Sequence, residues 1–258
     1  MIVYKYVARN RINVLETGRI RFTQANALND PFEVNPCLLE FMEGAKEYAR
    51  TVYKVPKLTT EQIEVYARKE ASAFLQRVYP DYLILSLSKI NDNRLMWSHY
   101  ADSHRGMVLG FDSIHPFFSA WRPGVTPLMD ADYSETRFVL RRDKDWTNDS
   151  VVGMFLRKSS DWIYEGEVRM FARSTAADKV DIAPDGQPLY LFNYPSECLK
   201  EVIFGVLAND DFRLNVMKIV RVKHPHVRLF QAMLNETDFN LEMVEFSDDG
   251  EENQKADR

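Results

Sequence analysis

Two carboxylates separated by a single residue, Glu165 and Glu167, stand in the segment DWIYEGEVR at residues 161–169. Side chains two positions apart in a β-strand point to the same face. The residues from Glu167 onward alternate between polar and apolar types, which predicts a strand with one core-facing side. We therefore expect both acids on one face of a strand, where catalysis, a metal ion or a buried arginine would each account for them.

The chemistry open to these acids follows from their neighbours. Carboxylates beside Trp162 and Tyr164 would be partly desolvated, and could act as a general base, a metal ligand or a stabiliser of a cationic intermediate. Arg169 could instead neutralise one acid in a purely structural pair. A pair alone does not explain why two acids, two aromatic residues and Lys158 occur together in KSSDWIYEGEVR at residues 158–169, so we predict a functional role for Glu167.

Two further clusters of polar and aromatic residues interrupt the core pattern. In NDPFE, residues 29–33, Asn29 could cap an Asx turn. A purely structural turn and a segment that lines a binding pocket account for these residues equally well. In MWSHYADSHRG, residues 96–106, His99 and His104 are five apart, a poor helical spacing for shared metal ligation, and no cysteine is near. We expect structural histidines there, no zinc site, and close backbone approach at Gly106.

The elements that must position these clusters follow from periodicity and capping signals. We expect a mixed α+β fold in which a helical insertion near residues 40–78 precedes a run of strands, with a capping box at Thr59 and Gln62. The expected strands lie near residues 2–6, 20–22, 82–87, 107–111, 201–206, 227–229 and 241–246. The expected helices outside the insertion lie near residues 12–18 (capped by Asn10 and ended by Gly18), 95–101, 150–158 and 209–219.

Composition limits the classes of function. The 258 residues are 45% hydrophobic and 28% charged, as in ordinary globular proteins, and we expect one domain over residues 1–246 with a disordered acidic tail over 247–258. With that tail set aside the chain is nearly neutral, so charge does not predict unspecific nucleic-acid binding. Only Cys37 and Cys198 are present, no apolar run is long enough to span a membrane and no secretory signal is evident, so we expect a cytoplasmic protein.

An ordered set of motifs resembles a bacterial and phage family known only as a domain of unknown function. The motifs are YKY at residues 4–6, NDPFE, MWSHYA and WxYExEVR, and the match covers most of residues 1–206. The layout is also similar, more distantly, to the ADP-ribosyltransferase superfamily, whose compact members begin with a strand, a helix ending in glycine and a second strand. That resemblance implies an ADP-ribosyltransferase-like fold with a mixed or antiparallel central sheet, and a toxin or phage-defence effector.

In that superfamily a Glu/Gln-x-Glu pattern opens a late strand, and here it falls on Glu165 and Glu167. The resemblance implies that Glu167 stabilises the oxocarbenium-like transition state as nicotinamide leaves NAD, while Glu165 positions the acceptor. The first strand usually supplies a His or Arg to the NAD ribose. This chain has Tyr4, Lys5 and Tyr6 there, so Lys5 would contact a phosphate and a tyrosine would stack on nicotinamide.

Three hypotheses therefore stand. The first is an NAD-using ADP-ribosyltransferase-like enzyme with NAD as substrate and a protein or nucleic acid as acceptor. The second is a metal-dependent phosphodiesterase or nuclease that uses clustered carboxylates, and the third is a non-enzymatic ligand- or partner-binding module. The predicted catalytic residues are Glu165 and Glu167. The predicted cofactor-binding residues are Tyr4, Lys5, Tyr6, Asn29, Asp30, Glu33, His99, Tyr100 and Arg169.

Overall fold

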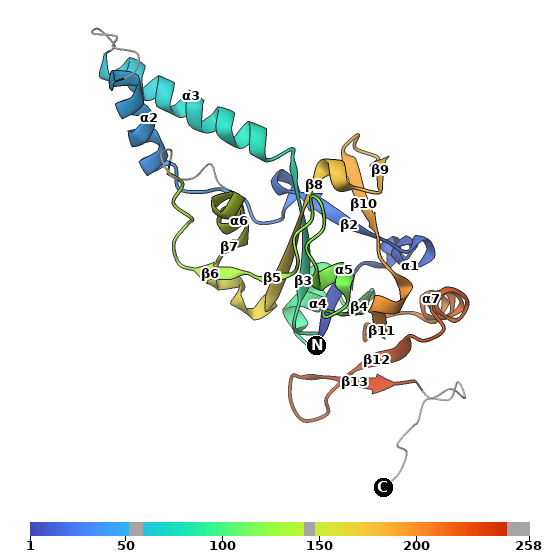
Figure 1. The fold of residues 1–258 in the computed structure, drawn as a ribbon. Helices are drawn as coiled ribbons and strands as arrows, with labels where there is room; N and C mark the ends of the chain where they lie inside the picture. Colours follow the sequence, from blue (N-terminus) through green and yellow to red (C-terminus); the bar gives the residue numbers. More distant parts are fainter. Residues whose placement is uncertain (52–58, 142–147, 247–258) are drawn as a thin grey trace.

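The computed structural model describes residues 1–51, 59–141 and 148–246, and within them the chain is a mixed α+β structure built on one large sheet (Figure 1). The main sheet has eleven strands, in the order β13-β12-β11-β4-β1-β3-β2-β10-β9, with β8 paired to β3 and β5 to β8. Of these pairings only that of β11 with β12 is parallel. The expectation of a mixed α+β fold with a mixed sheet is confirmed.

The strands of this sheet are β1 (Ile2–Val7), β2 (Arg19–Gln24), β3 (Tyr82–Ser88), β4 (Met107–Asp112), β5 (Met129–Asp130), β8 (Glu167–Arg173), β9 (Lys179–Ile182), β10 (Pro188–Asn193), β11 (Leu199–Phe204), β12 (Arg228–Leu234) and β13 (Leu241–Glu245). A separate parallel pair joins β6 (Asp132–Ser134) to β7 (Arg157–Ser159). The α-helices are α1 (Asn13–Thr17), α2 (Leu39–Thr51), α3 (Thr60–Val78), α4 (Arg94–Tyr100), α5 (Pro116–Ser119), α6 (Asn148–Leu156) and α7 (Asp210–Lys223). The 3₁₀ turns are η1 (Arg9–Arg11), η2 (Ala25–Ala27), η3 (Ser160–Glu165), η4 (Ser174–Ala176) and η5 (Ser196–Cys198).

The predicted helical insertion is present as α2 and α3, which project from the sheet as an antiparallel pair (Figure 1). Phe41 near the start of α2 packs on Phe74 near the end of α3, with ring centroids 5.7 Å apart. The predicted capping box is confirmed, because Thr59 accepts from the Gln62 amide and the Gln62 side chain accepts from that of Thr59. The segment 52–58 between them lies outside the described residues, as does the predicted tail 247–258.

The sheet divides along one edge of β3. At its start β3 pairs with β2, where Ile84 lies opposite Thr23, and at its end it pairs with β1, where Ser88 lies opposite Tyr4. The opposite edge of β3 is fully paired with β8. Among the described residues no strand pairs with Leu85–Leu87 on the divided edge, so β1 and β2 diverge there. This divergence creates the opening in which the candidate site lies.

Most predicted elements are found within a few residues of their expected bounds, but two predictions near the motifs are wrong. Asn10 does not cap α1; it lies in η1, and Ile12 holds the N-cap position. The helix expected over residues 150–158 ends at Leu156, because Arg157–Ser159 pairs with β6 as a strand. Gly18 ends α1 in the left-handed conformation with φ 63°, as predicted from its position.

Gly106 is a point of close backbone approach, as the sequence predicts. A Cβ built there would lie 2.2 Å from the Val7 carbonyl oxygen and 2.9 Å from that of Ala101. Both obstacles are backbone atoms, so they cannot turn aside as a flexible side chain could. We expect Gly106→Ala to lower the free energy of unfolding by about 2–3 kcal/mol, measurable by urea denaturation. A cost below about 0.5 kcal/mol would contradict the close approach of β1 and β4.

Candidate functional site

A cavity of about 200 Å³ opens where β1 and β2 diverge. Strand β3 supplies its floor, while β1, the loop after η2, α4 and the η3–β8 segment supply its walls. Each wall brings residues from one of the sequence clusters. The lining residues are Tyr4, Lys5, Tyr6, Thr23, Ala27, Leu28, Asn29, Asp30, Glu33, Ser86, Leu87, Ser88, Met96, Tyr100, Lys158, Trp162, Glu165 and Glu167.

Most of the residues selected from the sequence meet in this cavity, although they span 163 positions of the chain from Tyr4 to Glu167. Two do not line it. His99 is exposed on the outer side of α4, with its ring 6.0 Å from that of Tyr100, because Met96, Trp97 and Ala101 take the buried side of that segment. His99 is therefore not placed to bind a ligand in this cavity. The selected residues that do line it are Tyr4, Lys5, Tyr6, Asn29, Asp30, Glu33, Tyr100, Glu165 and Glu167.

Arg169 is the second exception. It is fully buried below the cavity, where its Nε donates to Glu167 Oε1 and its Nη2 to Glu167 Oε2, each at 2.8 Å. Its Nη1 donates to the Phe155 carbonyl at 2.6 Å, and its Nη2 also contacts Glu33. The guanidinium thus holds two carboxylates in place and cannot reach a ligand. The assignment of Arg169 as a direct cofactor contact is wrong.

Glu165 and Glu167 are brought together differently from the prediction. Only Glu167 belongs to a strand, since Glu165 ends η3 and Gly166 turns the chain between them with φ 51°. That left-handed conformation suits glycine, which lacks the Cβ that would clash. The two carboxylates converge because both bind the ammonium of Lys158, at 2.6 Å for Glu167. The shared partner, rather than a shared strand face, sets their separation.

Lys158 is the centre of a buried network of charged groups. Its Nζ lies 3.1 Å from Glu33 Oε1, in addition to its bonds to Glu165 and Glu167, and its side chain is 5% exposed. Sequence reasoning noted this lysine but did not place it in the site. The sequence feature that could have indicated its role is the motif KSSDWIYEGEVR at residues 158–169, in which Lys158 precedes Glu165 and Glu167. The network contains three carboxylates and two cations, so its formal charge is −1.

The electrostatics of the network favour the charged forms of Glu167, Lys158 and Arg169. Burial alone would raise the pKa of Glu167, but Arg169 and Lys158 lower it to about 2. Burial would lower the pKa of Lys158, but Glu167, Glu33 and Glu165 raise it above its ordinary value. A carboxylate that stays ionised to such low pH is a weak base. Glu167 is therefore suited to stabilise positive charge and not to remove a proton.

Hydroxyl groups orient Glu165 and Glu167 from both sides of the cavity. Tyr100 Oη donates to Glu165 Oε1 at 2.8 Å, and burial followed by the Glu165 charge raises the pKa of that phenol. Ser88 Oγ donates to the Glu165 carbonyl at 2.6 Å, and the Glu167 amide donates to Tyr133 Oη at 2.8 Å. These contacts fix the backbone on both sides of Gly166, so the acids are held before any ligand arrives.

The NDPFE segment is a structured wall of the cavity. Asp30, and not Asn29 as predicted, closes the Asx turn by accepting from the Phe32 amide at 2.8 Å. Its other oxygen accepts from Trp162 Nε1 at 2.9 Å, which ties the loop to η3. Val34 follows with φ 55°, a conformation that is costly for a β-branched residue. This backbone arrangement directs Glu33 into the network below the cavity.

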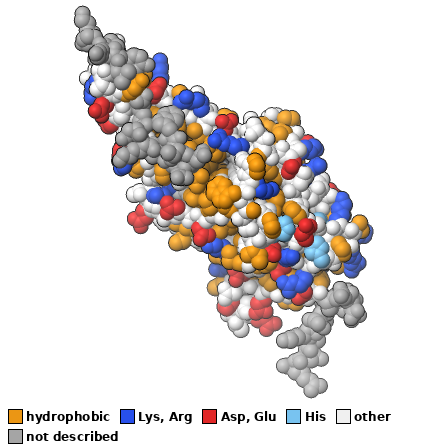
Figure 2. Space-filling view, viewed as in Figure 1, with side chains coloured by type: hydrophobic (Ala, Val, Ile, Leu, Met, Phe, Trp, Pro, Cys, Tyr) orange, Lys and Arg blue, Asp and Glu red, His pale blue; other side chains and the backbone are white. Residues whose placement is uncertain are grey.

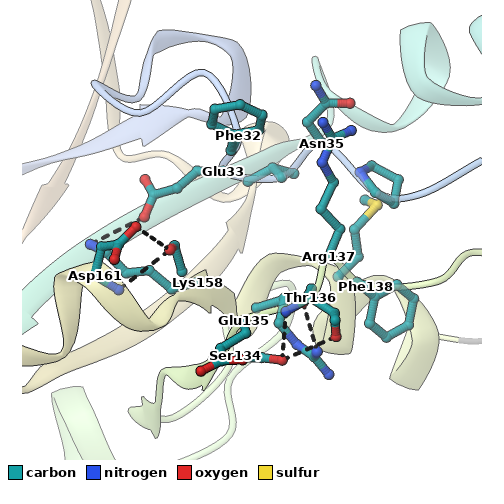
Figure 3. A pocket seen from close by; sticks show the side chains of 15 residues that line it. Phe32, Glu33, Asn35, Ser134, Glu135, Thr136, Arg137, Phe138, Lys158 and Asp161 are labelled. Atoms are coloured by element: carbon teal, nitrogen blue, oxygen red, sulfur yellow. Dashed lines mark hydrogen bonds and ion pairs between the residues drawn. The ribbon is translucent and has the colours of Figure 1, made fainter.

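A second cavity, of about 280 Å³, adjoins the first across the Glu33–Lys158 pair, and both residues line both cavities (Figure 3). Figure 3 shows that Ser134, Thr136 and Arg137 line this second cavity together with Lys158. Its cations and acids are mixed, since Arg137 and Arg157 lie near Glu135 and Asp161. It therefore shows no preference for one sign of charge.

Two further findings bear on the hypotheses. Within residues 1–51, 59–141 and 148–246, no group of three or more His, Cys, Asp or Glu side chains could hold a metal ion, and Lys158 occupies the position between carboxylates that a cation would take. In the same part of the chain, no helix combines the length and apolar character needed to cross a bilayer. On the face shown in Figure 2, acidic and basic side chains are interspersed.

Comparison of the chain with protein-family models, with curated proteins and with solved structures gives no match in any of the three.

Proposed function

We propose that this protein is an NAD-using ADP-ribosyltransferase-like enzyme whose reaction centre is the cavity between β1 and β2. The observation that carries the proposal is the meeting of Glu165 and Glu167 with Tyr4, Tyr6 and Tyr100 in that one cavity. Carboxylates and aromatic rings together suit a ligand with a cationic ring, because both attract positive charge. The nicotinamide ring of NAD carries such a charge.

The charge of the network supports this reaction. Breaking the bond between nicotinamide and ribose leaves a positive charge on the sugar, and the nicotinamide departs with the bonding electrons. A fixed carboxylate in a network whose formal charge is −1 would stabilise that developing charge more than it stabilises the uncharged sugar. With a pKa of about 2, Glu167 remains ionised throughout the neutral range. An acceptor nucleophile then bonds to the sugar and releases its proton to solvent.

Glu165 has the carboxylate that receives fewer bonds from the protein. Its Oε1 accepts from Tyr100 and its Oε2 binds Lys158, whereas Glu167 already receives three bonds through its two oxygens. Each carboxylate oxygen can accept about two bonds, so both Glu165 oxygens can still receive a hydroxyl. We assign Glu165 to a ribose or acceptor hydroxyl, and Glu167 to the charge of the transition state.

The test is release of nicotinamide from NAD by the full chain, followed by chromatography, with and without candidate protein and nucleic-acid acceptors. We expect nicotinamide release that EDTA leaves unchanged and that Glu167→Gln slows by about 10²–10³-fold. No release above a buffer blank with any acceptor would overturn the proposal. Cleavage of nucleic acid that a divalent cation stimulates and EDTA abolishes would instead support the metal-dependent phosphodiesterase or nuclease.

A binding module is the second candidate, and one observation favours it. Within the described residues the three carboxylates and two cations satisfy one another without any ligand, as a purely structural network would. This candidate predicts that NAD raises the melting temperature without being consumed. Differential scanning fluorimetry combined with the nicotinamide assay separates the two candidates in a single experiment.

A further inference from the structure

Three cations from different elements lie near one another, and one of them, Lys5, lines the cavity where β1 and β2 diverge. Lys5 is on β1 and lines the cavity, Arg11 ends η1, and Arg21 is on β2. Arg21 shares a strand face with Thr23, which also lines the cavity. The electrostatic influence of Arg21 and Arg11 on Lys5, and of Arg11 on Arg21, shows that the three groups are close enough to repel one another.

None of the three forms an ion pair with a carboxylate among the described residues, although Glu167 and Glu165 lie near enough to Lys5, and Asp185 to Arg21, to act on their charges. The Lys5 ammonium donates to the Ser86 carbonyl at 2.8 Å. Ser86 belongs to the part of β3 that pairs with neither β1 nor β2. The Nε of Arg21 is buried without any hydrogen-bond partner. A buried donor left unpaired costs about 1–3 kcal/mol, so this arrangement is unfavourable in the absence of a ligand.

The charged surroundings explain why an anion would be favourable there. Burial lowers the pKa of Lys5 to about 8; Glu167 and Glu165 oppose this change, and Arg21 and Arg11 add to it. Burial, followed by Arg11, also lowers the pKa of Arg21, and Asp185 only partly opposes this. A bound anion would relieve the repulsion and give the Arg21 Nε an acceptor. The cavity lining thus contains Lys5 as well as Glu165 and Glu167, and the charges of Arg21 and Arg11 act on Lys5 from nearby.

We infer that Lys5, Arg11 and Arg21 form a diphosphate-binding subsite at the edge of the cavity. Its identity as the site for the diphosphate of NAD rests on the proposed function. The 200 Å³ cavity is smaller than the usual 300–1,000 Å³ of ligand pockets, so it would hold one end of a dinucleotide while the rest extends outward. The three cations would bind the diphosphate where it leaves the cavity, because guanidinium and ammonium groups pair well with phosphate oxygens.

The experiment is isothermal titration calorimetry of the full chain with three probes: ADP-ribose, inorganic pyrophosphate and nicotinamide riboside, which has no phosphate. We expect Arg21→Gln and Arg11→Gln each to weaken binding of ADP-ribose and pyrophosphate about tenfold, and to leave nicotinamide riboside unchanged. Arg19→Gln is the matched control, because Arg19 is on the same strand but donates to Asn193 Oδ1 at 3.0 Å. Circular dichroism verifies that each variant is folded.

A pH series adds a readout specific to Lys5. The protonated amine binds the anion, so wild-type affinity for ADP-ribose should fall as pH rises from 7 through the Lys5 pKa of about 8 to 9. Because the Lys5 pKa of about 8 lies inside this range, Lys5→Met should remove the dependence. A wild-type affinity that is unchanged over this pH range would contradict the role of Lys5.

The outcomes separate this inference from the proposed function. Binding of ADP-ribose and pyrophosphate that depends on Arg21, without nicotinamide release from NAD, supports the subsite and overturns the enzyme. Nicotinamide release with ADP-ribose affinity equal in wild type, Arg11→Gln and Arg21→Gln overturns the subsite and leaves the enzyme standing. Absence of any binding of ADP-ribose or pyrophosphate to the wild-type chain also overturns the subsite.

Discussion

Glu167→Gln should lower the rate of nicotinamide release from NAD by about 10²–10³-fold, the range found when one preorganised group that stabilises transition-state charge is removed. The amide keeps the size of the side chain but removes the negative charge that faces the developing cation. Because the pKa of Glu167 is about 2, the wild-type group is ionised at every pH used in the assay. We expect the loss in kcat, with little change in KM for NAD.

The structural role of Glu167 must be separated from this effect, since its loss also removes an acceptor from Arg169 and Lys158. Glu201→Gln is a suitable comparison: Glu201 is also buried and pairs with Arg228 at 2.5 Å, but it does not line the cavity. Both variants should lose stability, measured by urea denaturation, whereas only Glu167→Gln should lose activity. Equal activity of Glu167→Gln and wild type at a temperature where both are folded would exclude the proposed role.

The meeting of the clusters in one cavity could be anticipated from sequence, because each cluster broke an otherwise regular core pattern. Residues such as Asp30 and Tyr100 are polar or aromatic where the periodicity of their segment did not require them, and both line the cavity. Helix and strand periods, the capping box at Thr59 and the glycines at 18 and 106 depend on local chemistry, which a single sequence displays directly.

The charge network could not be derived in the same way, because its geometry depends on contacts distant in the chain. Glu33 and Arg169 are in contact although they are 136 positions apart in the sequence, and no local pattern predicts that pairing. Lys158 belongs to β7, which pairs with β6. The segment that contains β6 shows no clear helix or strand periodicity in the sequence. His99 was selected for its chemistry, but the apolar residues around it decided its exposure. Tertiary packing overrides the local signal in each of these cases.

Arg169→Met should have the largest effect on stability, a loss of about 3–5 kcal/mol in the free energy of unfolding at pH 7. Arg169 is fully buried and compensates Glu167 and Glu33, so its removal changes the network from −1 to −2. Arg173→Met on the same strand is the control: that guanidinium is 41% exposed and 3.8 Å from Asp81, and its loss should cost less than about 1 kcal/mol.

The pH dependence of the Arg169→Met defect distinguishes lost charge compensation from lost packing. In wild type the pKa of Glu167 lies below its ordinary value, so this group contributes stability above about pH 4.5 that is lost as pH falls toward 2. Without Arg169, burial dominates and the pKa of Glu167 rises, so protonation stabilises the variant. The defect measured by urea denaturation should therefore be smaller at pH 5 than at pH 7. A defect that is constant between these two pH values would indicate lost packing instead.

Replacing both partners tests whether the network exists for stability or for chemistry. An apolar pair of similar volume often matches or exceeds a buried ion pair in stability, because it avoids the cost of desolvating two charges. In Glu167→Met/Arg169→Met, Lys158 still pairs with Glu33, 3.1 Å away, and with Glu165, and the formal charge of the network stays at −1. We expect this double variant to recover most of the stability lost in Arg169→Met and to release no nicotinamide. Recovery of both stability and activity would show that Glu167 is structural, and the binding module would then be the better account of the cavity.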